Sequence, residues 1–499
     1  MKLKTALYLS HRWLGIFMCL LFIMWFFSGV VMMYIGYPEL TLEERYAGTS
    51  KLAHDRITYS PSDLLVQSNL GAAVDQLILT NIADRPVYLQ GQSRLQHAVM
   101  YADSGEFIEQ VSPELAVESA RSFYRNQHQV SEPISGEFKE LLEMDQWSIS
   151  SSLSTHRPLH LISIEDAAGT NLYVSSRTGQ VVLDTTRRER FWNWLGSNIH
   201  WIYPLQLRKH SNIWGNVIIV LSLIGLVSVI TGAIIGIIRL RFKHPYRGKD
   251  ITPYKGMVKY HHIVGLMSLV FLLTYMFSGL MSMAPWGLFD SDTSFRRQVS
   301  RYQYSGSSSE LGVAFSKETE IQQLLARPEN QDVKQIVWHR LDNESYVAMH
   351  DAPGDVRVSS SLTTTLNIEL KVEETVTRLI PMSNIVELQK LDNYDAYYYS
   401  HHSRFHPLPI LRIKFDDRES NWFHIDLKSG QVLGRMTLAN RVQRWLFNGF
   451  HSLDFTSLIY NRPIWDVVVI MLCGLGMAFS ITSAIISWRR IGRFYKSIS

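Results

Sequence analysis

The sequence predicts a membrane α-helical protein: four transmembrane helices in two parallel repeats, with two extracytoplasmic α+β domains. Three observations support this fold class: four long apolar runs, three short basic segments beside them, and residue pairs that recur 250 or 251 positions apart. The overall composition, 46% hydrophobic and 19% charged, hides the apolar runs because long polar stretches separate them.

Each apolar run is long enough to cross a bilayer as one helix. The runs 13–37, 213–238 and 263–289 contain no charged residue, and the run 464–488 contains only Asp466. A spanning helix needs roughly 20 apolar residues, and inside lipid only helices and closed barrels satisfy every backbone polar group. The first run is longer than the apolar part of a signal peptide and lacks a small-residue cleavage site, so we expect it to be a retained helix.

Basic residues flank the apolar runs on one side of the predicted membrane. They are Lys2, Lys4 and Arg12; Arg239, Arg241, Lys243, Arg247, Lys249, Lys255 and Lys259; and Arg489, Arg490, Arg493 and Lys496. By the positive-inside rule these segments are cytoplasmic. We therefore expect an inner-membrane protein in a lipid bilayer, with both termini in the cytoplasm. The net charge of +4 follows from this topology and does not indicate nucleic-acid binding.

The runs divide the chain into eight predicted segments. These are a cytoplasmic N-terminus and first helix, 1–37; a periplasmic α+β domain, 38–212; the second helix, 213–238; a basic cytoplasmic loop, 239–262; the third helix, 263–289; a second periplasmic α+β domain, 290–463; the fourth helix, 464–488; and a cytoplasmic tail, 489–499. In each exported region a strand–glycine–strand pattern predicts a hairpin, at Gly179 and at Gly430.

An internal repeat links the two halves of the chain. The pairs His11/His261, Gly15/Gly265, Ser28/Ser278 and Gly29/Gly279 are 250 apart, and Gly179/Gly430, Trp194/Trp445, His200/His451 and Trp214/Trp465 are 251 apart. Each half has two helices and starts in the cytoplasm, so the halves are parallel repeats about an axis along the membrane normal. Equivalent residues are then expected at equal depth in the membrane.

The repeat distinguishes four of the 18 histidines. His11 and His261 are placed at the cytoplasmic ends of their helices, and His200 and His451 at the outer ends. A lone histidine at such a position usually bonds a backbone carbonyl or a lipid headgroup, and duplication alone would preserve the pairs. However, two imidazoles that face each other across an axis supply the two axial nitrogens of a b-type haem. The sequence therefore predicts two haem b groups, with iron bound by His11 and His261 and by His200 and His451.

Two details of this prediction remain open in the sequence. His262 competes with His261, because one helical step turns a side chain by about 100° and only one of the two can face the axis. The register with His11 favours His261. The glycines near the histidines leave room for a flat cofactor, although close helix packing explains them equally well. They are Gly15, Gly29, Gly265 and Gly279.

Several of these motifs together resemble the PepSY-associated transmembrane family. They are residues 11–15, 27–29, 178–181 and 194–200, and the resemblance covers nearly the whole chain. It implies PepSY-like exported domains, and it implies that the four histidines are haem ligands. Some members are iron-regulated inner-membrane proteins that bind two haems and reduce ferric siderophores. The second half departs from the pattern at His262, where the first half has Arg12.

The favoured function is electron transfer across the membrane to a periplasmic ferric chelate. No G-x-G-x-x-G follows a strand and no P-loop is present, so the electron donor is expected to be a cytoplasmic protein or a quinol. A candidate surface for the chelate comprises His401, His402, Arg404 and His406. A smaller group of histidine and arginine residues in the first half could correspond to this surface. It comprises His156, Arg157 and His160. A solvated loop is the alternative interpretation of this surface.

A different class of function also fits the sequence. The exported domains would then bind peptides or regulate a periplasmic protease without enzymatic activity, and the helices would serve as anchors. Purification without haem would favour this alternative. A role in transport has little support, because Asp466 is the only acidic residue within the apolar runs.

Overall fold

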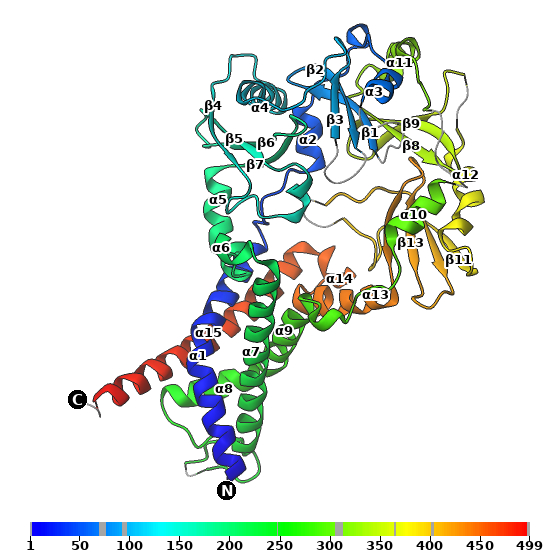
Figure 1. Cartoon of the computed structure of the whole chain (residues 1–499). Coiled ribbons are helices and arrows are strands. Elements are labelled where there is room, and N and C mark those ends of the chain that lie inside the picture. The colour runs from blue at the N-terminus through cyan, green and yellow to red at the C-terminus, as the bar shows by residue number, and fades with distance from the viewer. Residues whose placement is uncertain are drawn as a thin grey trace. The chain divides into compact units, whose positions relative to one another are not determined.

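The computed structural model describes residues 2–68, 76–91, 97–246, 248–304, 313–363, 366–400 and 404–496 (Figure 1). The chain forms two compact units. The helical unit comprises Met1–Tyr37, Phe191–Asp290 and Ala439–Ser499. The β-rich unit comprises Pro38–Arg190 and Ser291–Leu438.

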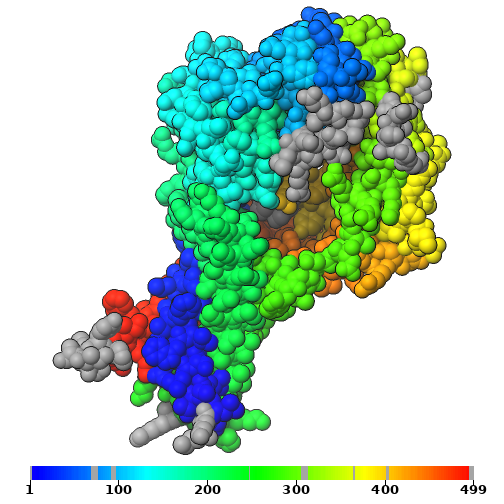
Figure 2. Space-filling model, viewed as in Figure 1, coloured from blue at the N-terminus to red at the C-terminus, as the bar shows by residue number. Residues whose placement is uncertain are grey.

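The helical unit is built from long apolar helices and short helical turns. Its elements are α1 Lys2–Met32, the π-helical turn η3 Trp194–Asn198, α6 Leu205–Arg208, α7 Ser211–Arg239, α8 Met257–Met267, α9 Leu269–Ser282, η4 Pro285–Gly287, the π-helical turn η7 Trp445–Gly449, α14 Thr456–Ile459 and α15 Arg462–Lys496. In the space-filling view, α1 (blue) lies between α15 (red) and α7 (green), and it contacts both helices (Figure 2).

Three of the helices in the described part of the chain are long and apolar enough to cross a membrane: Leu3–Met32, Ser211–Arg239 and Arg462–Arg493. The fourth predicted span, 263–289, is instead a pair of helices, α8 and α9, that meet at an angle of 67°. Counted as one span, the bent pair would make four. The hydroxyl of Ser268 at the break donates to the carbonyl of Val264 at 2.7 Å. Bonds of this kind are often found where helices bend.

The helices pack around an apolar core in the middle of the unit. Met18, Phe22 and Phe26 from α1 meet Tyr275 from α9 and Trp465 from α15 in this core. Each of these side chains is nearly inaccessible to solvent. By contrast, Leu20, Val220, Val270 and Met471 are exposed on the same helices. A helix with both a packed and an apolar exposed face is expected where lipid covers the exposed one.

The β-rich unit contains three antiparallel sheets. A six-stranded sheet has the order β10-β9-β8-β1-β2-β3, and two four-stranded sheets have the orders β4-β5-β6-β7 and β11-β12-β13-β14. The strands are β1 Gln76–Ile82, β2 Arg85–Gly91, β3 His97–Tyr101, β4 Gly136–Leu142, β5 Leu159–Ile164, β6 Asn171–Ser175, β7 Val181–Thr185, β8 Gln335–Leu341, β9 Glu344–Ala352, β10 Asp355–Ser359, β11 Ile385–Leu391, β12 Ile410–Phe415, β13 Trp422–Asp426 and β14 Val432–Met436.

Short helices accompany the sheets. They are α2 Leu42–Gly48, η1 His54–Arg56, α3 Pro61–Gln67, α4 Pro113–His128, η2 Ser151–Thr155, α10 Phe295–Gln303, α11 Glu318–Leu325, η5 Pro328–Asn330, α12 Ile368–Thr375 and η6 Val376–Leu379, with α5 Arg187–Asn193 and α13 Leu438–Arg444 at the unit boundaries. The helix α4 packs on the sheet β4–β7 through Ala116, Ala120 and Phe123. The predicted hairpins are present, and their turns place Gly179 and Gly430 at φ +75° and +71°, a conformation that suits glycine.

The regions 38–212 and 290–463 share one sheet, which differs from the prediction of two separate domains. Strand β1 from the first region pairs with β8 from the second, with Ile78 opposite Val337. Leu79 and Ile336 are buried in one common core. Separate domains would leave β1 and β8 as sheet edges, and the pairing removes both edges. The structure also places the ends of these regions, 191–212 and 439–463, in the helical unit.

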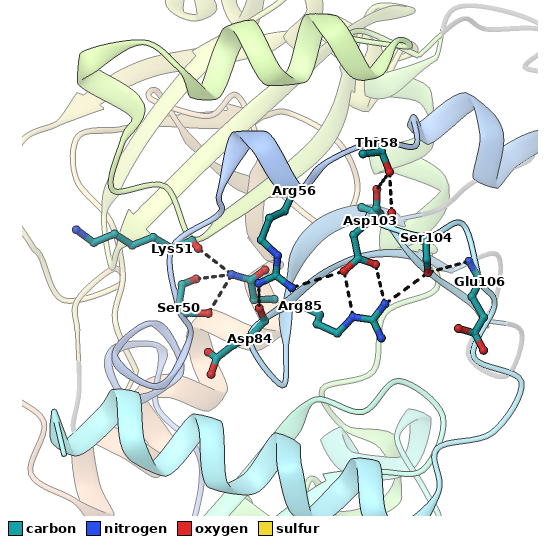
Figure 3. A network of polar contacts seen from close by, with 11 residues as sticks. Ser50, Lys51, Arg56, Thr58, Asp84, Arg85, Asp103, Ser104 and Glu106 are labelled. Carbon is teal, nitrogen blue, oxygen red and sulfur yellow. Dashed lines mark hydrogen bonds and ion pairs between the residues drawn. The ribbon is translucent and has the colours of Figure 1, made fainter. Parts of the chain in front are cut away.

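A polar network fixes the turn between β1 and β2 (Figure 3). Arg85 donates two hydrogen bonds to the carboxylate of Asp103, at 3.0 and 2.7 Å. Arg56 lies 3.6 Å from the same carboxylate and donates to the carbonyl of Asp84 in the turn, at 2.7 Å. Paired guanidinium–carboxylate bonds of this kind have a defined geometry. The network therefore joins the β1–β2 turn to η1 and to the segment after β3.

Candidate functional site

The first histidine pair of the repeat comes together inside the helical unit. His11 from α1 and His261 from α8 have ring centroids 6.4 Å apart, with 34° between the ring planes. Nδ1 of His11 lies 3.2 Å from the carbonyl oxygen of Ser228 on α7. Nδ1 of His261 lies 3.1 Å from the hydroxyl oxygen of Thr482 on α15. Four helices thus position this pair.

The second pair also comes together. His200 and His451, each two residues after a π-helical turn, have ring centroids 6.1 Å apart and planes at 71°. Nδ1 of His200 lies 3.0 Å from the hydroxyl of Ser28 on α1, and Nδ1 of His451 lies 3.1 Å from the hydroxyl of Ser278 on α9. Both serines are completely buried. The sequence marked them as repeated residues, but their contact with the histidines was not foreseen.

The hydrogen bonds select one tautomer for each ring. Ser28 donates its hydroxyl proton to the carbonyl of Met24 at 2.7 Å, and Thr482 donates to the carbonyl of Phe479 at 2.6 Å. Their oxygens therefore accept the Nδ1–H of the histidine. Ser278 donates in the same way to Tyr275, and the Ser228 carbonyl can only accept. In all four rings Nδ1 is the donor, which leaves the Nε2 lone pair for another partner.

Glycines lie against three of these rings. A Cβ added at Gly29 or Gly279 would lie 3.7 or 3.5 Å from Cε1 of the nearest outer histidine, which is ordinary contact. A Cβ at Gly232 on α7 would lie only 2.6 Å from Cε1 of His11. Gly232 is therefore required for the position of that ring. The internal repeat did not indicate Gly232, because the equivalent residue in the second half is Ser483.

A cavity of about 490 Å³ adjoins the inner pair. Both histidines line it, together with Gly15, Gly265 and mainly apolar side chains from α1, α7, α8, α9 and α15. Nothing lies within 4 Å of a Cβ placed on Gly15, whereas one on Gly265 would contact Phe479 at 2.9 Å. The volume and the apolar lining are typical of sites for small molecules and cofactors.

His262 is engaged on both sides of its ring. Its Nδ1 lies 2.7 Å from the hydroxyl of Thr252, and its Nε2 lies 2.9 Å from the carbonyl oxygen of Gly236. The side chain is buried, and it joins the loop between α7 and α8 to α7. Since neither nitrogen is left over, the geometry favours His261 for pairing with His11.

The ring separations of both pairs match those of two histidines bound to one iron. Metal–nitrogen bonds of about 2 Å, added to roughly 1 Å from each nitrogen to its ring centre, separate two such rings by about 6 Å. The observed separations are 6.4 and 6.1 Å. A histidine that binds metal usually donates its other N–H to an oxygen. Among the described residues, no group of three or more His, Cys, Asp or Glu is arranged to hold a metal ion without a cofactor.

The candidate chelate surface is only partly accessible. His401 and His402 lie outside the described residues. Arg404 is exposed, whereas the ring of His406 packs edge-on against Tyr398 with centroids 5.2 Å apart. Burial, together with the charge of Arg404, lowers the pKa of His406. Of the described members, Arg404 is the one that faces solvent with a full positive charge.

The first-half counterpart is not a surface cluster. His160 is buried, with Nε2 3.0 Å from the carbonyl oxygen of Val111. Arg157 donates to the carbonyls of Ser148 and Ser150 at 2.6 and 3.0 Å. Burial, followed by the charge of Arg45, lowers the pKa of His156 to about 4. These residues support the fold locally and do not form an anion site.

The apolar helices and the α+β unit define a membrane protein with a folded extramembrane part. The model of the family described as the PepSY-associated TM region matches residues 8–490. The chain therefore belongs to this family, as its motifs predict. In a comparison with curated proteins, none matches the chain.

Proposed function

We propose that the chain is a di-haem electron-transfer protein of the inner membrane that reduces a periplasmic ferric chelate, such as a siderophore. In this proposal His11 and His261 hold one haem b, and His200 and His451 hold the other. One observation carries it: two histidine pairs, each about 6 Å between ring centres, have all four Nδ1 atoms engaged and all four Nε2 atoms left over.

The topology belongs to the same proposal. The three long helices and the bent pair α8–α9 would form four spans in two parallel repeats, with both termini in the cytoplasm. Basic residues beside the helix ends and matched residues 250 or 251 apart support this arrangement. The inner pair would then lie near the cytoplasmic surface and the outer pair near the periplasmic surface.

The residues of the chain would hold, orient and insulate the cofactors. Bound haem supplies one-electron chemistry. Ser28, Ser278, Thr482 and the Ser228 carbonyl would fix the ligand rings, and the apolar cavity walls would exclude water. The electron donor would be a cytoplasmic protein or a quinol, and one electron would convert the ferric chelate to its ferrous form.

Aromatic contacts connect the two sites. Phe22 lines the inner cavity and lies 6.2 Å from Trp25 between ring centroids. The indole N–H of Trp25 donates to the carbonyl of His200 at 3.0 Å. In the other half, Tyr275 lies 5.6 Å from the ring of His451. Phe22 and Trp25 thus link the inner cavity to the backbone of His200.

Visible spectra of the detergent-purified full chain test this function. Oxidised and dithionite-reduced spectra should show two low-spin b-type haems per chain. His11→Ala and His451→Ala should each remove about one haem. His262→Ala tests the rival ligand beside His261; because both nitrogens of His262 are already bonded, this variant should keep both haems. Retention of both haems in both ligand variants would reject the assignment.

The non-enzymatic alternative has one observation in its favour. Strands β4 and β11 are outer strands of their four-stranded sheets and are largely exposed. An extended peptide can add to such an edge through main-chain hydrogen bonds. A chain that purifies without haem but binds extended peptides would favour this function.

A further inference from the structure

The cavity beside His11 and His261 has an unbalanced charge. Arg12 from α1 and Arg490 from α15 are its charged lining residues, and no Asp or Glu lines it. Nε of Arg12 is buried and has no hydrogen-bond partner in the structure. Within the described residues, neither guanidinium forms an ion pair. Arg490 itself is exposed, but a buried guanidinium nitrogen without a partner is costly, so the Arg12 side of the cavity is suited to an anionic group.

The residues at the equivalent positions of the other repeat form hydrogen bonds within the protein. His262 stands 250 residues after Arg12, and both its nitrogens are bonded. Arg239 stands 251 residues before Arg490, and its Nε donates to the hydroxyl of Tyr8 at 2.5 Å. The equivalent residues on α7 and α8 are therefore already bonded within the protein. Those on α1 and α15, two helices in direct contact, are left for a ligand.

We propose that Arg12 and Arg490 bind the two propionate carboxylates of the haem held by His11 and His261, an inference that rests on the proposed function. Haem b carries two carboxylates on one edge, and guanidinium binds carboxylate through paired, charge-assisted hydrogen bonds. The carboxylate edge would then face α1 and α15. This explains why one side of a repeated site has unpaired arginines and the other side does not.

The two arginines act as positioning residues, and they also set the reduction potential. Their positive charge offsets the carboxylates, so it favours the reduced form, which carries one more electron than the oxidised form. Replacing both arginines with glutamine should shift the equilibrium toward the oxidised haem. It should also weaken haem retention at the inner site alone.

Spectroelectrochemical titration of the full chain in detergent tests the proposal. Arg12→Gln combined with Arg490→Gln should lower the equilibrium constant for reduction of one haem about tenfold, which equals about 59 mV for a one-electron couple. The second haem should be unaffected. Arg12→Lys in the Arg490→Gln background should recover part of the shift, because lysine keeps the charge but lacks the paired donors.

Arg489→Gln is the matched control. It removes the same charge one residue along α15, at a position that is exposed like Arg490 but does not line the cavity. A helical step of about 100° turns it away from the site of Arg490. Both reduction potentials should stay at the wild-type values. An equal shift in this variant would show a general charge effect and overturn the proposal.

The other outcomes separate this inference from the proposed function. Two bound haems with unchanged potentials in the double variant would overturn the inference and leave the function intact. A wild-type chain without any haem would overturn both. Unchanged potentials together with loss of co-purifying anionic phospholipid would assign the arginines to a lipid phosphate and also overturn the inference.

Discussion

The hydroxyl oxygen of Ser28 lies 3.0 Å from Nδ1 of His200, and the serine is completely buried. The hydroxyl proton is donated to the carbonyl of Met24, so the oxygen accepts from the imidazole. The same arrangement recurs between Ser278 and His451 at 3.1 Å. An oxygen at this position fixes both the orientation of the ring and the nitrogen that carries the proton.

Ser28→Ala should therefore weaken haem binding at the outer site. The change leaves the N–H of His200 buried without an acceptor and releases the ring. We expect the affinity of that site to fall about 10- to 100-fold, as for other residues that support a metal ligand. The rate of haem transfer from the purified chain to an excess of a haem-scavenging protein measures this loss of affinity.

Ser480→Ala is the control for Ser28→Ala. Ser480 is also completely buried in the helical unit, but its hydroxyl bonds only the carbonyl of Gly476. Haem transfer should proceed at the wild-type rate in this variant. Equal rates in wild type, Ser28→Ala and Ser480→Ala would show that the serine does not support a ligand.

Gly232→Ala should displace His11 and disturb the inner site selectively. The new methyl group would lie 2.6 Å from Cε1 of His11, so the ring has to move. Haem content should fall by about one per chain, with the loss confined to the site of His11. Gly474→Ala on α15 is the matched control, since nothing lies within 4 Å of its added Cβ. A Gly232→Ala protein with two haems and wild-type spectra would contradict the inferred ring position.

Asp103→Asn should destabilise the β-rich unit at neutral pH. It removes the paired bonds from Arg85 and the ion pair with Arg56. We expect a loss of up to about 1 kcal/mol, because the pair is partly exposed. Hydrogen exchange of the β2 and β3 amides measures it. Glu137→Gln is the control, because the Lys139–Glu137 pair is exposed on both sides and should contribute little.

The Asp103 effect should also depend on pH. The hydrogen bond from Arg85 lowers the pKa of Asp103 below its usual value. A carboxyl group with a lowered folded pKa contributes stability above its unfolded pKa of about 3.9, and this is lost as pH falls through the folded pKa. The wild type and Asp103→Asn should therefore differ at pH 7 and converge once the pH falls below the lowered folded pKa of Asp103. A constant difference over this range would contradict the assignment.

The sequence predicts some features well because their causes are local or repeated. Long uncharged runs predict the helices, and a glycine between two strand-like runs predicts the hairpin at Gly179. The bend between α8 and α9 interrupts an uncharged apolar run, so hydropathy does not report it. The pairing of Ile78 with Val337 joins strands far apart in the chain, and no local pattern indicates it.

The candidate site also has some features that the sequence predicts and others that it does not. Recurrence at a fixed spacing predicted that His11 would meet His261 and that His200 would meet His451, and the structure brings each pair together. Their role as haem ligands stays a prediction. Gly232 was missed because its equivalent is a serine. Comparison of the two repeats detects residues that both halves share. A residue that is present in only one half, such as Gly232, is recognised only from its contacts in the structure.

Asp184→Asn should stabilise the β-rich unit, and the gain should grow as pH rises. Burial on β7, followed by the charges of Glu44 and Glu189, raises the pKa of Asp184 to about 7. The unfolded chain ionises this group near pH of about 3.9. Wild-type stability therefore decreases as pH rises from about 4 to 7, because the folded state retains a proton that the unfolded state releases. Asparagine has no such proton, so the unfolding temperature of the variant should match wild type at pH 4 and exceed it at pH 8. A variant that is equally stable to wild type at pH 8 would show that the folded protein tolerates an ionised Asp184.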